Sequence, residues 1–429
     1  MRFMHGHTKF VVSSLFAILW LSVSVAVSIV WIRDVLKVLP TWYVAWVIIG
    51  IALLPGYLMS AMFISNILNR KVESIACKDA GSVCVLICAR NEESTIYKTI
   101  ECIAAQQYCS HIKIICVDNA STDGTSGEIR RAAWSLHNPM RSVYLVHCRI
   151  PGKFNALNAG LKYVDTKYFI TVDADTMLEK NALCAILSRI KNNNAGCVAG
   201  NLFVQNTNTL ISKMQIYDYL ISIAAVKRYQ GSYDSTLVAQ GAFSAYNTSA
   251  VKELGGWRNG AGEDIVLTYR LLSMGLKSLY EPQAVGYTVV PDTFKKFCRQ
   301  RIRWAMGMFE GIAAIRPWQQ PSFAGGYFET LNLSIVYLDL AYVFGFLAGV
   351  ILSVFGITWF VGWQTLLLFP AVMINVISVY MFQRKTAGQF ATSKLGFLCF
   401  LVLFQPIQSV CSLIGYAKAL LKRKIIWKQ

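Results

Sequence analysis

Four long stretches of this chain contain no charged residue, and they limit its fold more than any other feature. They are residues 10–32, 38–69, 340–383 and 395–417. A membrane helix needs about 20 apolar residues, so each stretch can hold one helix and the third can hold two. The charged part between Arg70 and Glu329 has roughly 260 residues, which is large enough for one α/β domain.

The amino-acid composition is explained by these two parts, because the apolar residues are concentrated in one and the charged residues in the other. Of 429 residues, 55% are hydrophobic and only 15% are charged, whereas soluble domains usually carry about 25% charged residues. Such hydrophobicity excludes a disordered chain. The formal net charge of +18 favours anionic partners. Nucleic acid is disfavoured among them, because no nucleic-acid-binding module is recognisable and the chain is expected to lie in a membrane.

The N-terminal stretches predict two membrane helices. Residues 10–32 are too many for the apolar core of a signal peptide, which has about 7–15 residues, so we expect a retained helix, with a cleaved signal peptide as the alternative. Pro55 lies inside the second stretch and predicts a kink. The basic residues that follow favour a cytoplasmic position for the next domain: Arg70, Lys71 and Lys78.

The C-terminal part predicts three further spans, near 333–355, 359–382 and 395–417, which makes five in all. Asp339 is expected at the membrane interface, with a functional role as the alternative. The last segment has Gln405 to Gln408 in its middle, so it is a candidate for a re-entrant or cavity-lining helix. A full crossing there would also place the basic C-terminal tail outside, against the positive-inside tendency.

Short β-rich apolar runs alternate with helical patterns through the middle domain. Strands are expected over 82–90, 112–119, 142–147, 167–175 and 196–201, and helices over 94–106, 125–136 and 152–163. This rhythm predicts a parallel sheet with helices on both faces. Ligands bind such sheets beyond the carboxyl ends of the strands.

Acidic residues follow two of these strands. Asp118 ends one, and Asp173 and Asp175 end another. Carboxylates gathered at one edge favour a hard cation such as Mg²⁺ or Mn²⁺. The Asp-x-Asp pair alone is a weak signal, and a solvated loop is its alternative. The chain has no Gly-x-Gly-x-x-Gly after a strand, no P-loop and no Cys-x-x-Cys pair, so dinucleotide, P-loop and zinc sites are not indicated.

Two further motifs lie nearer the C-terminus of the domain. Glu263 and Asp264 follow Gly262 and precede a helical pattern, where acidic residues could simply favour the helix dipole. The second motif, Gln300 to Trp304, lies in a basic and aromatic amphipathic stretch that could be an interfacial helix. Arginine beside tryptophan can equally bind a diphosphate and stack on a sugar ring.

Taken in order, these motifs resemble the signature of processive family 2 glycosyltransferases with the GT-A fold. The signature is carried by Asp118, Asp173-x-Asp175, Gly262-Glu263-Asp264 and Gln300-x-x-Arg303-Trp304. Cellulose, chitin, hyaluronan and poly-N-acetylglucosamine synthases belong to this group. The likeness runs from about Val83 to Gly311 and continues into the flanking apolar segments. It implies a GT-A domain with a mixed, mainly parallel sheet, flanked by transmembrane helices.

Within that group, the bacterial poly-β-1,6-N-acetylglucosamine synthases of biofilms are the most similar. The similar stretches are 152–158, 173–176, 200–201 and 280–282. In two places the chain departs from this subgroup. Gly262 stands where the subgroup usually has threonine, and it and residues 290–293 look more like rhizobial chitooligosaccharide synthases. The resemblance therefore implies the reaction more closely than it implies the sugar.

The resemblance also implies a UDP-sugar donor and the residues that bind it. Asp118 would contact the uridine, and Lys153 would lie near the nucleotide or its phosphates. Asp173 and Asp175 would hold the donor, Asp175 most directly, through Mg²⁺ or Mn²⁺. Arg303 would stabilise the departing diphosphate.

The acceptor, a growing polysaccharide, would lie beside Asp264. Asp264 is the expected general base for inversion at the anomeric carbon, with Glu263 as its catalytic neighbour. Trp304 would stack near the acceptor sugar, and Gln300 would help to position the sugar or the diphosphate.

The expected organisation has four parts. Residues 1–70 hold two membrane helices, 71–293 the cytoplasmic GT-A domain, 294–330 amphipathic interfacial helices, and 331–429 two to three membrane helices with a basic tail. We expect a multi-pass protein of the inner or plasma membrane that contacts acidic lipids. Coupled export of the polymer and a small accessory membrane subunit are further expectations.

Three alternatives stay open. One is a chitin- or hyaluronan-type synthase. Another is a transferase that adds one sugar to a polyprenyl phosphate, although such sequences usually lack the Gln-x-x-Arg-Trp motif. The last is a catalytically silent membrane scaffold that kept the fold, which the complete set of motif residues disfavours.

Overall fold

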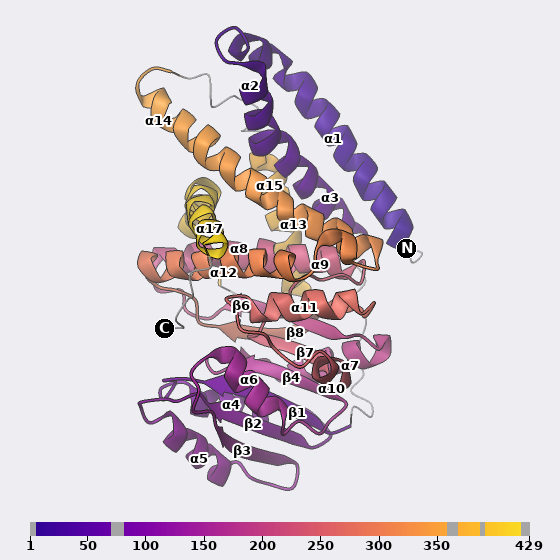
Figure 1. Ribbon diagram of the computed structural model, residues 1–429, viewed down its shortest axis with the longest axis vertical. Coiled ribbons are helices and arrows are strands. Elements are labelled where there is room, and N and C mark those ends of the chain that lie inside the picture. The colour runs from indigo at the N-terminus through magenta and orange to yellow at the C-terminus, as the bar shows by residue number, and fades with distance from the viewer. Residues whose placement is uncertain (1–5, 70–80, 358–367, 387–390, 422–429) are drawn as a thin grey trace.

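A bundle of long helices stands on an α/β domain (Figure 1). The computed structural model describes residues 6–69, 81–357, 368–386 and 391–421. Between the two parts lies one long amphipathic helix, α12 (Phe294–Ala314). Lys71, Lys78 and the basic tail beyond residue 421 lie outside the described residues.

The domain is built on one eight-stranded sheet. Its strands are β1 (Val83–Ala89), β2 (Ile112–Asp118), β3 (Arg141–His147), β4 (Tyr168–Asp173), β5 (Met177–Leu178), β6 (Cys197–Val204), β7 (Phe243–Asn247) and β8 (Ser278–Thr288). They lie in the order β3-β2-β1-β4-β7-β6-β8-β5. Strands β1 to β4 and the pair β6–β8 are parallel, whereas β7 is antiparallel to both neighbours and β5 is antiparallel to β8. The mixed, mainly parallel sheet implied by the resemblance is confirmed.

The local strand patterns alone predicted a purely parallel sheet, and that prediction was incomplete. The five expected strands are present, but β5, β7 and β8 were not among them. β8 contains Pro282, which has no N–H to give to a neighbouring strand. The pairing of β6 with β8 shifts register between Ala199 and Asn201, opposite this stretch, so the irregularity accommodates the proline.

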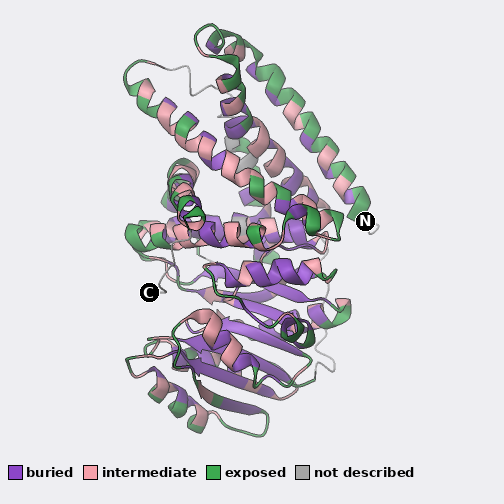
Figure 2. Cartoon of the chain, viewed as in Figure 1, coloured by how far each residue is buried: buried purple, intermediate pink, exposed green. Residues whose placement is uncertain are grey.

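Alternate residues of the central strands face two separate cores. In β1, Val83, Val85 and Ile87 pack with α4, α5 and α7, whereas Cys84 and Leu86 pack with α6, α10 and α11. Both sides of the strand are therefore buried, which explains why it reads as an unbroken apolar run (Figure 2). The helices of the domain are α4 (Ile96–Ala104), α5 (Thr125–Ser135), α6 (Lys153–Leu161), α7 (Ala182–Asn193), α8 (Leu210–Asp218), η2 (Tyr219–Ala225), α9 (Val226–Gly231), α10 (Thr248–Glu253), α11 (Glu263–Ser273) and, after α12, η3 (Pro317–Gln319).

Four helical segments of the described chain are long and apolar enough to cross a membrane: Gly6–Val35, Thr41–Leu68, Phe323–Val354 and Lys394–Leu420. Their elements are α1 (Gly6–Val35), α2 (Thr41–Ile48), η1 (Ile49–Leu53), α3 (Leu54–Leu68), α13 (Phe323–Ala341), η4 (Tyr342–Leu347), α14 (Ala348–Val354), α16 (Lys394–Cys399), η6 (Phe400–Phe404) and α17 (Gln405–Leu420). The predicted span at 359–382 falls partly outside the described residues, and α15 (Leu368–Thr386) covers the rest of it.

Local irregularities mark the prolines in these segments. Pro55 stands in the first turn of α3, directly after the π-helical segment η1, and Pro406 follows the π-helical segment η6 in the same way. Proline cannot donate a backbone hydrogen bond, and its ring displaces the carbonyl one turn earlier. A locally widened turn accommodates both effects without ending the helix.

The last apolar segment lies along the domain over its whole length. A Cβ atom on Gly396 of α16 would lie 2.7 Å from the carbonyl oxygen of Lys213 in α8. One on Gly415 of α17 would lie 2.7 Å from the Cβ of Ala305 in α12. The start of the segment therefore contacts α8 of the domain and its end contacts α12, and Figure 1 shows α17 nearly end-on above α12.

Asp339 differs from its expected interfacial position. The helix that carries it begins at Phe323 rather than near 333, so Asp339 lies in the middle of the apolar segment Phe323–Val354. Its side chain is buried between α13 and α17. There it accepts hydrogen bonds from the hydroxyls of Ser409 (2.7 Å) and Tyr416 (2.8 Å), which compensate for the loss of water.

Candidate active site

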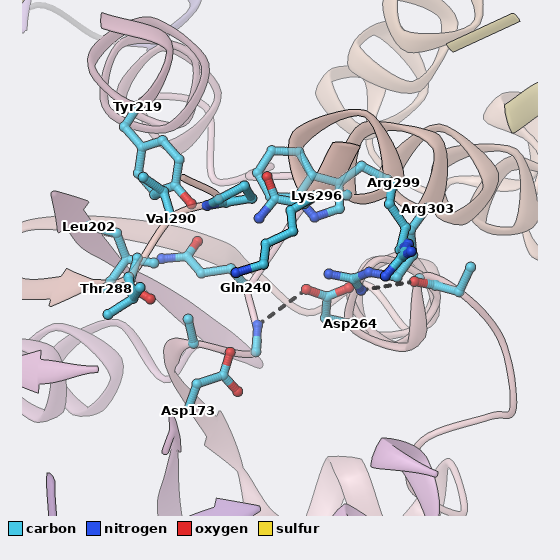
Figure 3. A pocket seen from close by; sticks show the side chains of 18 of the residues that line it. Asp173, Leu202, Tyr219, Gln240, Asp264, Thr288, Val290, Lys296, Arg299 and Arg303 are labelled. Atoms are coloured by element: carbon cyan, nitrogen blue, oxygen red, sulfur yellow. Dashed lines mark hydrogen bonds between the residues drawn. The ribbon is translucent and has the colours of Figure 1, made fainter. Parts of the chain in front are cut away.

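A cavity of about 1290 Å³ lies between the carboxyl end of the sheet and α12. Of the nine site residues expected from the sequence, eight line it: Lys153, Asp173, Asp175, Glu263, Asp264, Gln300, Arg303 and Trp304. In Figure 3, Asp173 lies below Asp264, and the α12 cations Lys296, Arg299 and Arg303 lie above both. The cavity therefore has an acidic floor and a basic roof.

Lys153 and Asp173 form an ion pair at the floor. Asp173 is the last residue of β4, and Lys153 is the first residue of α6. Their Nζ and Oδ1 atoms are 2.6 Å apart. Burial alone would lower the pKa of Lys153, but the carboxylates of Asp173, Glu263 and Asp264 outweigh it and hold the pKa above its usual value. Lys153 therefore stays charged beside a cluster of carboxylates.

Asp175 is the carboxylate that best fits a divalent cation. Burial, followed by the negative charge of Asp173, raises its pKa to about 7. The hydroxyls of Thr176 (3.4 Å) and Thr288 (3.5 Å) donate long hydrogen bonds to its Oδ1 atom. Among the described residues, no three His, Cys, Asp or Glu side chains form a metal-ligand group. Mg²⁺ or Mn²⁺ held by Asp175 would therefore take most of its other ligands from phosphates and water.

Glu263 and Asp264 form the first turn of α11. Asp264 Oδ2 accepts a hydrogen bond from the Gly241 N–H (3.1 Å), and Oδ1 accepts one from the Ile265 N–H (2.9 Å). Glu263 is 6% exposed, and burial, followed by the charge of Asp264, raises its pKa to about 7. Helix-dipole stabilisation and a chemical role are compatible here, because the turn that favours the acidic residues also faces the cavity.

Gly262 has a steric explanation. A Cβ atom at this position would lie 2.4 Å from the Cα of Gly307 in α12. A side chain such as threonine would therefore collide with α12 here, whereas glycine allows the backbones of the loop and of α12 to touch.

Helix α12 supplies the roof of the cavity. Gln300, Arg303 and Trp304 line it, and an Arg303 N–H donates to the Ala261 carbonyl oxygen (3.4 Å). Arg301 points away and is 2% exposed. It forms an ion pair with Asp218 (2.7 Å), and its guanidinium lies 4.3 Å from the centre of the Trp304 ring. The amphipathic pattern read from the sequence is therefore present, with cations on both sides of the helix.

Asp118 is the one expected site residue that is not among those lining this cavity. It ends β2, two strands away from β4. Burial would raise its pKa, but hydrogen bonds from Ser121 and Ser126 outweigh this effect and hold the pKa below its ordinary value. Asp118 is thus an ionised acceptor at the same sheet edge, separate from the cavity.

Several cavity residues were not singled out from the sequence. Tyr219 and Lys227 come from the η2–α9 segment, and Gln240 comes from the loop before β7. Burial lowers the pKa of Lys227 to about 7, against the opposing charge of Asp264. No spacing motif marks these positions, because only the path of the chain around the sheet brings them to the cavity.

Comparisons with known proteins identify the family. The family described as "Glycosyltransferase like family 2" matches residues 80–307, more than half of the chain. The chain belongs to this family. It is an enzyme of the glycosyltransferase class, and the catalytic motifs expected from the sequence lie within or at the edge of the matched residues.

The sequence of this glycosyltransferase is similar to those of two staphylococcal synthases. It is 28% identical over 283 residues to a poly-beta-1,6-N-acetyl-D-glucosamine synthase of Staphylococcus aureus, covering 64% of this chain and 67% of the relative. It is 30% identical over 227 residues to the Staphylococcus epidermidis synthase of the same name, covering 52% and 54% of the two chains.

One solved structure supports the fold alone. The mannosyltransferase PcManGT from Pyrobaculum calidifontis, solved with GDP-Man and Mn²⁺, superposes with a TM-score of 0.55. The match covers 86% of this glycosyltransferase and 99% of that chain, at 20% sequence identity. It therefore extends beyond the sheet into the flanking helices.

Proposed function

We propose that this glycosyltransferase is a membrane-embedded, inverting and processive enzyme that polymerises N-acetylglucosamine from a UDP-sugar into a β-linked polysaccharide. The observation that carries the proposal is the single cavity in which carboxylates of the sheet edge face cations and Trp304 of α12. The two staphylococcal relatives, named as synthases of such a polymer, support the choice of sugar. A chitin- or hyaluronan-type synthase is the nearest alternative.

The donor diphosphate is proposed to bind between Asp175 and Arg303. Lys153 is held by Asp173 and faces the same space, so it can pair with a phosphate without leaving the carboxylate. Asp173 and Asp175 are the residues that would hold Mg²⁺ or Mn²⁺, whose positive charge would offset the charge of the diphosphate as it leaves. Asp118 is proposed to contact the uridine from the end of β2, two strands away from β4.

Asp264 is the proposed general base. Its carboxylate is fixed by the backbone N–H groups of Gly241 and Ile265 and lines the cavity, so an acceptor hydroxyl can give it a proton while attacking the anomeric carbon. Attack from the face opposite the diphosphate inverts the configuration without a covalent intermediate. Glu263 precedes it in the first turn of α11 and lines the same cavity.

The acceptor polymer is proposed to lie against α12. Trp304 offers a ring on which a sugar can stack, and Gln300 has a buried side-chain oxygen without a hydrogen-bond partner among the described residues. A hydroxyl or amide N–H of the substrate would satisfy that oxygen. Lys418 of α17 lines the same cavity, so the apolar segments adjoin the proposed exit for the polymer.

The four-part organisation predicted from the sequence is also part of this proposal. We place the enzyme in the inner or plasma membrane as a multi-pass protein with its GT-A domain in the cytoplasm. Acidic lipids would face the basic roof helix, and an accessory membrane subunit is a candidate partner for export.

Substitution of the base tests the mechanism. We expect Asp264→Asn to lower polymerisation by about 100- to 10,000-fold, because the amide cannot take the proton. Binding of UDP, measured by isothermal titration calorimetry on the purified full chain, should stay close to wild type. Asp234→Asn is the matched control, since Asp234 does not line the cavity. Near-wild-type polymerisation by Asp264→Asn would refute the assignment.

The product distinguishes the remaining functions. Purified protein is incubated with several labelled nucleotide sugars, and the product is sized. A long polymer supports the synthase, a lipid-linked monosaccharide supports transfer to a polyprenyl phosphate, and no product supports a silent scaffold.

A further inference from the structure

Helix α12 holds the loop that leads into Asp264. The loop consists of residues 260–262, directly before α11. One carboxylate oxygen of Glu310, Oε2, accepts hydrogen bonds from the backbone N–H of Ala261 (2.7 Å) and of Gly262 (3.2 Å). Two consecutive donors of the loop therefore depend on a single side chain of α12.

Two other residues on the same face of α12 complete this contact. Arg303 donates to the carbonyl oxygen of Ala261, so both polar backbone groups of Ala261 are bound to α12. Gly307 touches Gly262 directly, since a Cβ on Gly307 would lie 2.6 Å from the Cα of Gly262. Positions 303, 307 and 310 follow the helical repeat, so they present one continuous surface, which we call the loop grip.

Glu310 does not line the cavity, unlike Arg303. Its hydrogen bonds connect Glu310 to the cavity through the loop. Hydrogen bonds from N–H groups to a carboxylate are stronger than those between neutral groups. The loss of the carboxylate would leave the N–H groups of half-buried Ala261 and buried Gly262 without this partner, which destabilises the local arrangement.

We propose that Glu310 is a positioning residue for glycosyl transfer, because it fixes the Asp264 turn against the face of α12 that carries Arg303. The inference rests on the proposed role of Asp264 as base. Asp264 lies two residues beyond Gly262, so a shift of the loop moves its carboxylate relative to the acceptor bound along α12. A displacement of about 1 Å in such a geometry can lower a rate about 100-fold.

Two substitutions at one position test the role. Glu310→Ala should lower kcat by about 10- to 100-fold with little change in KM for the donor or in UDP binding. Glu310→Gln keeps an acceptor oxygen of the same reach and should retain most of the wild-type kcat. Glu253→Ala, on an exposed glutamate of α10, is the control and should change nothing. Wild-type kcat in Glu310→Ala, or equal losses in the Ala and Gln variants, would overturn the proposal.

Backbone hydrogen exchange tests the contact without using activity. Mass spectrometry of the full chain should show faster exchange at Ala261 and Gly262 in Glu310→Ala, and near-wild-type exchange in Glu310→Gln. Unchanged exchange in Glu310→Ala would overturn the proposed grip. If wild-type protein transfers no sugar from any donor, the proposed function fails, while the exchange result still decides whether Glu310 holds the loop.

Discussion

At the scale of single residues, the cavity gathers more carboxylates than cations at its floor. Lys153 is paired with Asp173 and lies in the field of Glu263 and Asp264. Burial, followed by the negative charge of Asp173 and Asp264 respectively, raises the pKa values of Asp175 and Glu263 to about 7. The floor is therefore suited to bind a positively charged group, and its protonation depends on pH near neutrality.

Glu263 should make folding stability depend on pH. Its pKa rises from an ordinary value of 4.5 to about 7 in the folded chain, so between these values the folded state binds more protons than the unfolded state. The free energy of unfolding must then fall as pH rises through this range. We expect the apparent melting temperature of purified protein to fall from pH 5 to pH 8, and to fall less steeply in Glu263→Gln. Glu253→Gln is the control, and an unchanged slope in Glu263→Gln would contradict the assignment.

At the scale of elements, α12 connects the cavity to the rest of the molecule. One face carries the loop grip and the cavity residues, and the opposite face carries Arg301. The guanidinium of Arg301 lies between Asp218 at the end of α8 and the rings of Phe297 and Trp304. The buried charge thus fixes the rotation of α12 and with it the direction in which Trp304 faces.

The Asp218–Arg301 pair should show strong coupling in stability. Removal of one partner leaves a buried charge without compensation, which typically costs about 3–5 kcal/mol, whereas replacement of both by apolar groups can be nearly neutral. We expect Asp218→Leu and Arg301→Met each to unfold at lower temperature than wild type. The double variant should be more stable than the sum of the two changes implies. Additive losses in thermal unfolding would show that the pair does not act as a unit.

At the scale of the whole molecule, the last apolar segment decides the topology. Its start contacts α8, its end contacts α12, and Lys418 lines the cavity. We propose that this segment does not carry the chain across the membrane, because its start contacts α8 of the domain and its end contacts α12. In this proposal Lys418 would stay on the side of the domain, in agreement with the positive-inside tendency.

Cysteine labelling tests this topology. Lys37, in the loop between α1 and α2, and Leu420, at the end of α17, are both exposed. With a membrane-impermeant maleimide on intact spheroplasts, we expect Lys37→Cys to react and Leu420→Cys to react only after lysis. Exposed Cys109 serves as the internal reference for the side on which the domain lies. Labelling of Leu420→Cys before lysis would show that the segment crosses the membrane.

Local patterns were enough for much of the fold and for the candidate residues. The strands around β1, β2 and β4, the helix α12 and the four apolar segments follow from periodicity and composition, since burial of a regular element imposes a repeat on its own residues. The short motifs were also visible in sequence order. Strands such as β8 were missed because Pro282 and polar residues interrupt the repeat.

The sequence by itself therefore determined which segments are apolar, which elements alternate and which residues are candidates for the chemistry. Only the tertiary structure decided that Asp118 stands apart from the cavity, that Asp339 meets Ser409 in the bundle, and that Glu310 holds Ala261. The two contacts join residues that are far apart in the chain, and the position of Asp118 follows from the distance between the ends of two strands. Such relations depend on how whole elements pack, and no local repeat of side chains encodes them.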